Sequence, residues 1–213
     1  SSLLGSPSQV VPTLAQVLLQ SMCVCCGSPE RALCRRCRGE LRPAPSLLPP
    51  VGLVDCRALC RYDDVARTVL TSLKNGQRRD VVGLIAADLA EVLGPVAAGT
   101  VVTWAPTGAG RARRRGFDQA ELLARSVARR RGLAVRPLLR RSPGPAQAGR
   151  DRRARQLQVE FTIAGRVPLE VVLVDDVCTT GATLAAAGRA LRVAGARSVH
   201  GLVVARAVGS IGE

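Results

Sequence analysis

The clearest hydrophobic pattern in the chain is a run of four apolar residues at 171–174, followed directly by polar and small residues. Such a run predicts a strand that is buried on both of its faces. Two adjacent carboxylates, Asp175 and Asp176, follow where we expect the strand to end. After a short loop the apolar spacing becomes helical, over residues 184–194. The pattern therefore predicts a strand, a loop and a helix, with both carboxylates at the carboxyl end of the strand.

Strand and helix patterns alternate over most of the remaining chain. Asp63 or Asp64 is expected to cap a helix that ends near residues 74–76, and a second helix starts near Asp80 and ends before Pro95. The other predicted elements are strands over residues 100–104, 133–139 and 198–205, and a helix over residues 120–131 that Asp118 and Glu121 cap and Gly132 ends. Strands separated by helices indicate an α/β fold with a parallel-sheet core.

The loop after the central strand has the composition of a phosphate-binding site. Its residues are Thr179, Thr180, Gly181, Ala182 and Thr183. Small residues that open a helix expose backbone N–H groups and hydroxyls at the positive end of the helix dipole, which favours phosphate. The two aspartates before the loop suit the paired hydroxyls of a ribose. We therefore expect a ribose 5-phosphate site. The alternative is an ordinary turn in which Asp and Thr only cap the helix.

Two Cys-x-x-Cys pairs near the N-terminus predict a metal site. Cys23 with Cys26 and Cys34 with Cys37 supply four thiolates, which can close a tetrahedral structural zinc site with no open position. The alternative is a set of free or redox-active thiols. Three further cysteines leave the ligand set open: Cys25 could replace a neighbour, and Cys56 and Cys60 could join, although we favour small core residues for the last two.

The segment at residues 42–52 is rich in proline and resembles a linker in composition. We therefore expect a zinc-binding hairpin and linker over residues 1–50 and an α/β domain over residues 51–213. No apolar run is long enough to span a membrane, and we expect a reducing, cytoplasmic compartment. In that compartment eight cysteines favour metal binding over disulfides.

The formal net charge of +15 predicts an anionic partner such as a nucleotide or a polyanion. Lys74 is the only lysine, and arginine binds phosphate with two hydrogen bonds at once. A genome rich in G and C would explain the preference for arginine equally well. The densest basic segment, residues 110–116, is bounded by glycines and is expected to be a loop. Its Arg113, Arg114 and Arg115 could close over a phosphate group, or could form a solvated basic turn.

The central loop resembles the ribose-5-phosphate loop of type I phosphoribosyltransferases, and the chain as a whole resembles the ComF (competence protein F) family. The resemblance runs from Cys23 to about Ala207. The residues that carry it are the two Cys-x-x-Cys pairs, Tyr62, Leu73-Lys74, Arg115 to Gln119, Gln147, Arg155, Phe161 and the loop from Asp175 to Thr183.

This resemblance implies a type I phosphoribosyltransferase domain joined to an N-terminal zinc-binding region. It implies that Asp175 and Asp176 contact the ribose hydroxyls of phosphoribosyl pyrophosphate and that residues 179–183 hold its 5-phosphate. It also implies Mg²⁺ with the substrate, a pyrophosphate contact from the loop that contains Pro106 and Thr107, and a link to DNA uptake in natural transformation.

Two functions are compatible with these features. The first is phosphoribosyl transfer to a nitrogen acceptor with release of pyrophosphate, for which the candidate catalytic residues are Asp175, Asp176, Arg113, Arg115 and Lys74. The second is a non-catalytic module that binds nucleotide or single-stranded DNA and contacts proteins of the competence machinery. The low aromatic content, 2%, offers little base stacking for the second function. A redox protein that uses Cys25 and Cys178 is a weaker third hypothesis.

Overall fold

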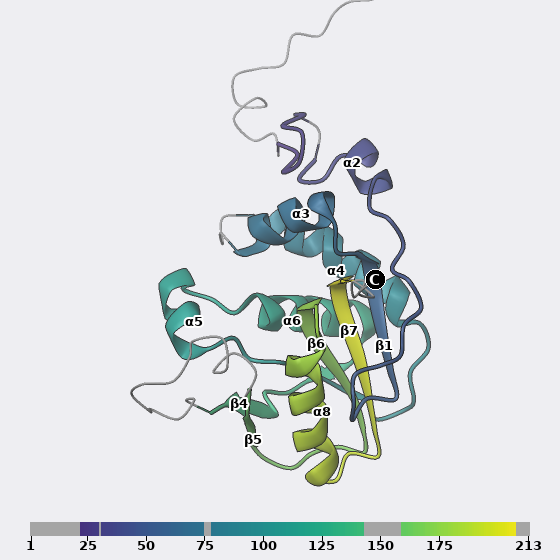
Figure 1. The fold of residues 1–213 in the computed structure, drawn as a ribbon, viewed down its shortest axis with the longest axis vertical. Coiled ribbons are helices and arrows are strands. Elements are labelled where there is room, and N and C mark those ends of the chain that lie inside the picture. The colour runs from purple at the N-terminus through teal and green to yellow at the C-terminus, as the bar shows by residue number, and fades with distance from the viewer. Residues whose placement is uncertain (1–21, 30, 75–77, 143–158, 208–213) are drawn as a thin grey trace, which may run out of the picture.

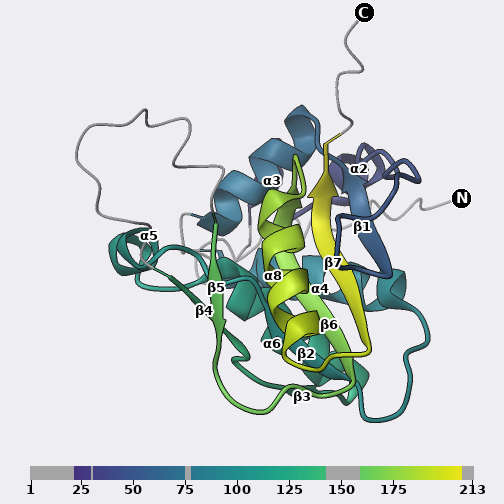
Figure 2. The ribbon, with the colours of Figure 1, turned by 60° about the horizontal axis from the view of Figure 1, so that its bottom comes forward.

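The computed structural model describes residues 22–29, 31–74, 78–142 and 159–207. Its centre is a five-stranded sheet in the order β1-β7-β6-β2-β3, and all of its pairings are parallel. Figure 1 shows β1, β7 and β6 side by side, and Figure 2 labels all five strands. The strands are β1 (Asp55–Arg61), β7 (Ser198–Arg206), β6 (Glu170–Cys178), β2 (Val101–Trp104) and β3 (Ala134–Val135). The predicted α/β fold with a parallel core is confirmed.

Helices cover both faces of this sheet. One face packs against α3 (Asp64–Lys74), α4 (Arg79–Leu93) and α6 (Gln119–Arg131), and the other against α8 (Ala182–Val193) (Figure 2). Alternate residues of β6 enter the two cores: Val172 and Val174 face the three helices, whereas Val171 and Leu173 face α8. Burial on both sides is the physical reason for the unbroken apolar run.

β6 extends further than its apolar residues indicate. Asp175 and Asp176 lie inside the strand, which continues to Cys178 because its backbone keeps pairing with β7 up to Arg206. The prediction that both carboxylates follow the strand is therefore wrong. Backbone hydrogen bonds do not depend on side-chain polarity, so a change from apolar to polar residues does not by itself end a strand.

The strand predicted over residues 133–139 is interrupted. Its first part is β3 in the main sheet, and its end belongs to β4 (Leu139–Arg141), which pairs antiparallel with β5 (Phe161–Ile163). Pro137 lies between the two strands and has no N–H group for a ladder, so the chain leaves the main sheet there.

The basic segment expected to be a loop contains a short helix, α5 (Ala109–Arg115), so that prediction is wrong. Alanine and arginine have high helix propensity, which outweighs the glycine at each end. Gly116 ends the helix with φ of 75°. The strand β1 was also not predicted. It lies at the edge of the sheet, and most of its side chains are half-buried, so its sequence does not alternate clearly between apolar and polar residues. Cys56 and Cys60 belong to this strand.

The other predicted elements are confirmed near their expected bounds. Asp63 accepts a hydrogen bond from the backbone N–H of Ala66 at the start of α3, and Asp118 caps α6. Gly132 ends α6 in the left-handed conformation. Gln147 and Arg155, which the family resemblance includes, lie outside the described residues, as does the rest of the arginine-rich segment at residues 150–155. No helix in the described ranges is long and apolar enough to cross a membrane.

Candidate functional site

The candidate phosphate loop, residues 179–183, which we call the phosphate loop, connects β6 to α8. Gly181 is the N-cap residue of α8, with φ of 76°, and has no side chain to cap the helix. Thr180 Oγ1 accepts from the backbone N–H of Ala182 at 3.4 Å, and both Thr179 and Thr180 are exposed. The start of α8 therefore presents backbone donors and two hydroxyls to solvent, as a phosphate site requires.

The two carboxylates before this loop lie in different surroundings. Asp176 Oδ2 accepts from Gln119 Nε2 at 2.6 Å and lies 3.3 Å from Lys74 Nζ. Gln119 in turn accepts from Arg115 through Oε1 at 2.7 Å. Among the described residues Asp175 forms no ion pair, and burial together with the charge of Asp176 holds the pKa of Asp175 well above its usual range.

These groups face a hollow of about 210 Å³, which we call the cationic hollow. Five predicted site residues beyond the two aspartates reach it, from four different parts of the chain. Its lining residues are Lys74, Ala105, Pro106, Thr107, Arg111, Arg115, Gln119, Arg141, Asp175, Asp176, Val177 and Thr183. Arg113 does not line this hollow and is exposed on α5. Residues 179–182 line a neighbouring hollow instead.

Asp118 links the loop before α5, which contains Thr107, to the start of α6. Its side chain caps α6 by accepting from the N–H groups of Ala120 and Glu121, and its Oδ2 accepts from the N–H of Thr107 at 2.7 Å. Burial raises the pKa of Asp118, although these backbone donors oppose the shift. The cap that the sequence indicated therefore also orients the loop that contains Pro106.

Arg141 was not identified from the sequence. It comes from the end of β4, lines the cationic hollow and lies over the Phe161 ring, with 6.0 Å from its guanidinium carbon to the ring centre. In a chain with so many arginines, no local pattern distinguishes this residue. Only the return of β5 beside β4 brings it to the site.

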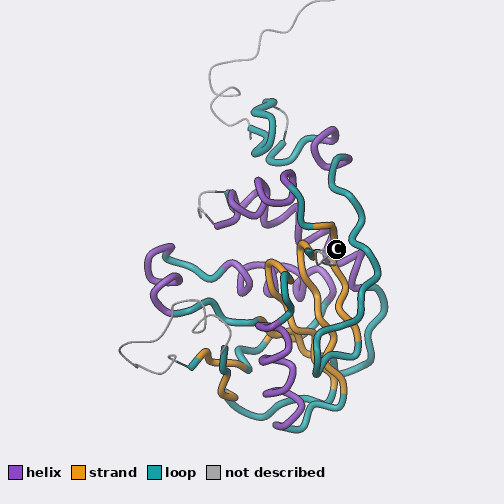
Figure 3. Tube along the Cα trace, in the orientation of Figure 1, coloured by secondary structure: helices purple, strands orange, loops and turns teal. Residues whose placement is uncertain are grey.

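Residues 47–53, which we call the strap, lie against the phosphate loop. They belong to the loop that runs from α2 (Arg35–Gly39) to β1 beside the sheet (Figure 3). Arg206, only 7% exposed, donates to the carbonyl oxygens of Leu47 and Leu48. The strap and residues 179–182 enclose the neighbouring hollow, whose volume is about 340 Å³.

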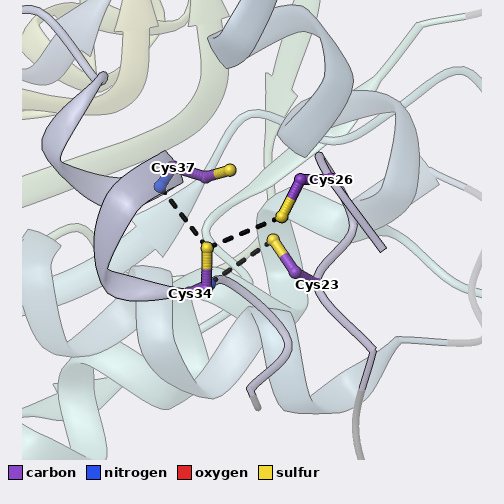
Figure 4. Close-up of side chains that lie close together, drawn as sticks. All are labelled: Cys23, Cys26, Cys34 and Cys37. Atoms are coloured by element: carbon purple, nitrogen blue, oxygen red, sulfur yellow. Dashed lines mark hydrogen bonds between the residues drawn. The ribbon is translucent and has the colours of Figure 1, made fainter. Parts of the chain in front are cut away.

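The four cysteines of the two Cys-x-x-Cys pairs come together (Figure 4). All four Sγ atoms lie within 4.8 Å of one another, and the Sγ atoms of Cys26 and Cys34 are 3.7 Å apart. Tetrahedral zinc with bonds of about 2.3 Å would separate its sulfur ligands by about 3.8 Å, so the group fits the ion. Among the described residues this group does not include Cys25, Cys56 or Cys60. Cys60 instead lies in the core and donates to the carbonyl oxygen of Val204.

Backbone N–H groups support the sulfur atoms of this cluster. Cys34 N–H donates to Cys23 Sγ at 3.4 Å, and Cys37 N–H donates to Cys34 Sγ at 3.5 Å. Burial by itself raises the pKa of Cys23, but backbone donors from Cys34, Cys26 and Cys25 outweigh it and lower that pKa to about 6. A stabilised thiolate is the form that binds a metal.

The cysteine segment is anchored to the helical face of the sheet. Arg38, in α2, forms an ion pair with Asp88 of α4, whose side chain is only 10% exposed. Arg78 donates to the carbonyl oxygen of Met22 at 2.6 Å. Three of the four cysteines are buried in the same core as α3 and α4. The boundary near residue 50 stays a prediction.

The parallel sheet, the loop at the carboxyl end of β6 and the cationic hollow define an α/β protein of the type I phosphoribosyltransferase fold. Residues 156–210 match the model of the phosphoribosyl transferase domain. This match contains β6, the phosphate loop, α8 and β7. No curated protein matches the chain.

One solved structure that resembles the chain is that of TT1426 from Thermus thermophilus. The sequence identity is 21% and the TM-score is 0.35, and the likeness covers 65% of this chain and 86% of that one.

Proposed function

We propose that this chain is a ComF-like phosphoribosyltransferase-family protein that binds phosphoribosyl pyrophosphate and transfers its phosphoribosyl group to a nitrogen acceptor in the cytoplasm. The observation that carries the proposal is the continuous unit of two carboxylates, a hydroxyl-bearing loop and a helix start. Its carboxylates and Thr183 line the hollow that four cationic side chains also line, and residues 179–182 line the hollow beside it. The domain match over residues 156–210 contains this unit.

The sugar phosphate would bind along this unit. Residues 179–183 would hold the 5-phosphate through backbone N–H groups and hydroxyls, helped by the dipole of α8. Asp176 would accept from one ribose hydroxyl, in place of part of its present contact with Gln119. Asp175, whose pKa is raised by burial and by the charge of Asp176, would contact the other ribose hydroxyl.

The pyrophosphate would extend into the cationic hollow. In the transfer the bond between C1 and the pyrophosphate oxygen breaks, a nitrogen atom of the acceptor bonds to C1, and that nitrogen loses a proton. Negative charge grows on the departing pyrophosphate, so Lys74, Arg115 and the loop with Pro106 and Thr107 would stabilise the transition state. Mg²⁺, when bound with the substrate, would neutralise part of the same charge. In this proposal Arg113, which is exposed on the same helix as Arg115, would contact the leaving group only after α5 shifts.

The zinc ion belongs to the structural part of the proposal. Cys23, Cys26, Cys34 and Cys37 would hold it, and their four thiolates leave no position for a substrate. The ion would therefore fix the fold of the N-terminal segment against α4 and take no part in the transfer.

Calorimetry with phosphoribosyl pyrophosphate and Mg²⁺ tests the binding step, and a screen of nucleobases for pyrophosphate release tests the transfer. Saturable binding of one equivalent and release with at least one acceptor are expected. Absence of binding would overturn the proposal. Binding without release from any acceptor would favour a non-catalytic role.

A second candidate function is the binding of nucleotide or single-stranded DNA within the competence machinery. The specific observation that favours it is the outer side of α5, where Arg113 and Arg114 are exposed and form no ion pair within the described part of the chain. Together with the net charge of +15, these arginines offer contacts to a phosphate backbone.

A further inference from the structure

Two thiols, those of Cys56 and Cys178, meet at the base of the phosphate loop. Cys178 ends β6 directly before the loop, and its Sγ atom lies 3.8 Å from a Cβ atom built on Gly181. Cys56 belongs to β1, and its side chain forms a hydrogen bond with the side chain of Cys178. Both residues pack in the core beneath α8. Two thiols in direct contact, from separate strands, can form a disulfide after a small shift.

Gly201 leaves the room that Cys56 needs to turn toward β6. It lies on β7, the strand between β1 and β6, and is the register partner of Cys56. A Cβ atom built on Gly201 would lie 3.0 Å from the Sγ atom of Cys56 and 2.6 Å from a methyl carbon of Leu53. A larger residue at this position would therefore push Cys56 away from its present place.

Arg206 brings a positive charge to the two sulfur atoms. Its buried side chain donates to the carbonyl oxygen of Cys56 at 3.4 Å and to the side chain of Cys178. Its other acceptors are carbonyl oxygens of the strap, and within the described part of the chain no carboxylate pairs with it. A buried guanidinium without a carboxylate partner favours another anion, and the thiolate of Cys178 provides one.

Cys178 combines the ionisation and the access that a reactive cysteine needs. The hydrogen bond from Cys56 lowers the pKa of Cys178 to about 7, burial opposes this shift, and Arg206 adds to it. The same hydrogen bond, together with burial, raises the pKa of Cys56. Cys178 also lines the hollow of about 340 Å³ between the strap and the phosphate loop. A molecule little larger than water, such as hydrogen peroxide, therefore has room to reach its sulfur atom.

We propose that Cys56 and Cys178 are a redox-sensitive pair that hydroperoxides convert into a disulfide beneath the phosphate loop. The thiolate of Cys178 attacks the terminal peroxide oxygen, the O–O bond breaks, and an S–O bond forms in a sulfenic acid, while the remaining alkoxide takes up a proton. The sulfur of Cys56 then attacks the sulfur of Cys178, the S–O bond breaks, and the released hydroxide leaves as water with the proton of Cys56. The two thiols thereby supply two electrons, which reduce one hydroperoxide to an alcohol and water.

Oxidation should also weaken the phosphate loop as a binding site, a consequence that rests on the proposed function. A disulfide is shorter than a hydrogen bond between two thiols, so its formation draws Cys178 toward β1 and pulls on the loop that follows. It also removes the anion that Arg206 faces. The oxidised protein should therefore bind ribose 5-phosphate about tenfold more weakly or worse, as expected when a hydrogen bond to a charged group is lost.

Mass spectrometry of the full chain after treatment with hydrogen peroxide tests the pair. Alkylation of the free thiols and digestion should yield a peptide that links Cys56 to Cys178 and that a thiol reductant separates. Cys60→Ser is the matched control and should still form this link, because Cys60 lies on the same strand but packs in the opposite core. If both thiols stay free in treated wild type, or if Cys178 links to a different cysteine, the pair is overturned. Wild type alone decides this point, so a variant that fails to fold leaves the test intact.

Calorimetry with ribose 5-phosphate separates the pair from the proposed function. Treated wild type should bind more weakly than reduced wild type, whereas treatment of Cys178→Ser should change nothing, which excludes an effect of the other cysteines. If the disulfide forms and the affinity is unchanged, the predicted effect on the loop is overturned. If reduced wild type does not bind ribose 5-phosphate, the proposed function fails, and the cross-linked peptide still decides whether the pair stands.

Discussion

Pro50 lies directly against Gly181, so that a Cβ atom on this glycine would come within 2.9 Å of the Pro50 Cγ atom. The contact joins the strap to the phosphate loop, although the two residues are far apart in the sequence. It explains why Gly181 has to be glycine for two reasons: its φ of 76° and the absence of space for a side chain.

Gly181→Ala should therefore be more destabilising than a glycine replacement that strains only the backbone. Gly132→Ala is the matched control, since Gly132 has φ of 64° and nothing within 4 Å of the added Cβ atom. The control should cost about 1–2 kcal/mol of unfolding free energy, and Gly181→Ala more than that. Denaturant titrations measure both values. Equal costs would mean that the strap can move away from the added methyl group without a loss of unfolding free energy.

Asp175→Asn should stabilise the protein at neutral pH. The folded-state pKa of Asp175 is raised above its unfolded value, so the folded state binds a proton that the unfolded state has lost. Its contribution to stability is therefore present below the unfolded pKa of about 3.9 and is lost as pH rises toward the folded pKa. Over that window this one group makes the unfolding free energy fall by up to about 1.4 kcal/mol per pH unit.

The asparagine variant removes this pH dependence. Denaturant titrations of wild type and variant between acidic and neutral pH should show a stability difference that grows with pH and vanishes near the unfolded pKa. A difference that is constant with pH would show that folding does not raise the pKa of Asp175.

The double variant Asp175→Asn with Asp176→Asn should weaken phosphoribosyl pyrophosphate binding while the protein still folds, because both side chains face the hollow. Thr180→Val should also weaken this binding, because it removes a hydroxyl that would donate a hydrogen bond to the 5-phosphate. Each hydrogen bond lost to a charged group costs roughly 1.5–3 kcal/mol. Thr162→Val, on the exposed side of β5, is the control and should leave the calorimetric affinity unchanged. Unaltered affinity in the double variant would mean that the ligand does not use the carboxylates.

Protein purified without added metal should contain about one equivalent of zinc. Cys37→Ser should release the ion and loosen the N-terminal segment, because this buried thiol is one of four ligands. Cys56→Ser is the control and should retain the ion, since Cys56 lies in β1 outside the cluster. Elemental analysis and thiol titration measure both outcomes. Metal-free folded protein whose four cluster thiols all titrate freely would contradict the zinc site.

Single-stranded DNA should bind weakly and with a steep dependence on salt. The logarithm of affinity should fall with the logarithm of salt concentration by roughly 0.7 per phosphate engaged. Replacing Arg113 and Arg114 together with glutamine should reduce both the affinity and this slope, since both side chains are exposed and unpaired within the described ranges. A fluorescence titration at two salt concentrations measures the slope. If no DNA binds at low salt, the positive net charge serves solubility or the binding of a small phosphorylated ligand instead.

Local patterns in the sequence were sufficient for the α/β class, the buried centre of β6, the cap of α6 at Asp118 and the close grouping of the four cysteines. Each depends on residues a few positions apart, where the period of a strand, the rules of helix capping or the Cys-x-x-Cys spacing apply directly. The hydroxyl-rich loop before α8 was also predicted from local sequence, because the residues next to a helix start determine where the helix begins.

Only the tertiary structure decided which distant residues meet at the site. Gln119 donates to Asp176 across 57 positions of sequence, and Arg206 reaches Leu48 across 158. Arg141 enters the hollow because Pro137 ends one strand and β4 then pairs with β5. No local periodicity encodes such contacts. They arise because parallel strands bring their carboxyl ends to one edge of the sheet, where side chains from separate segments share the same space.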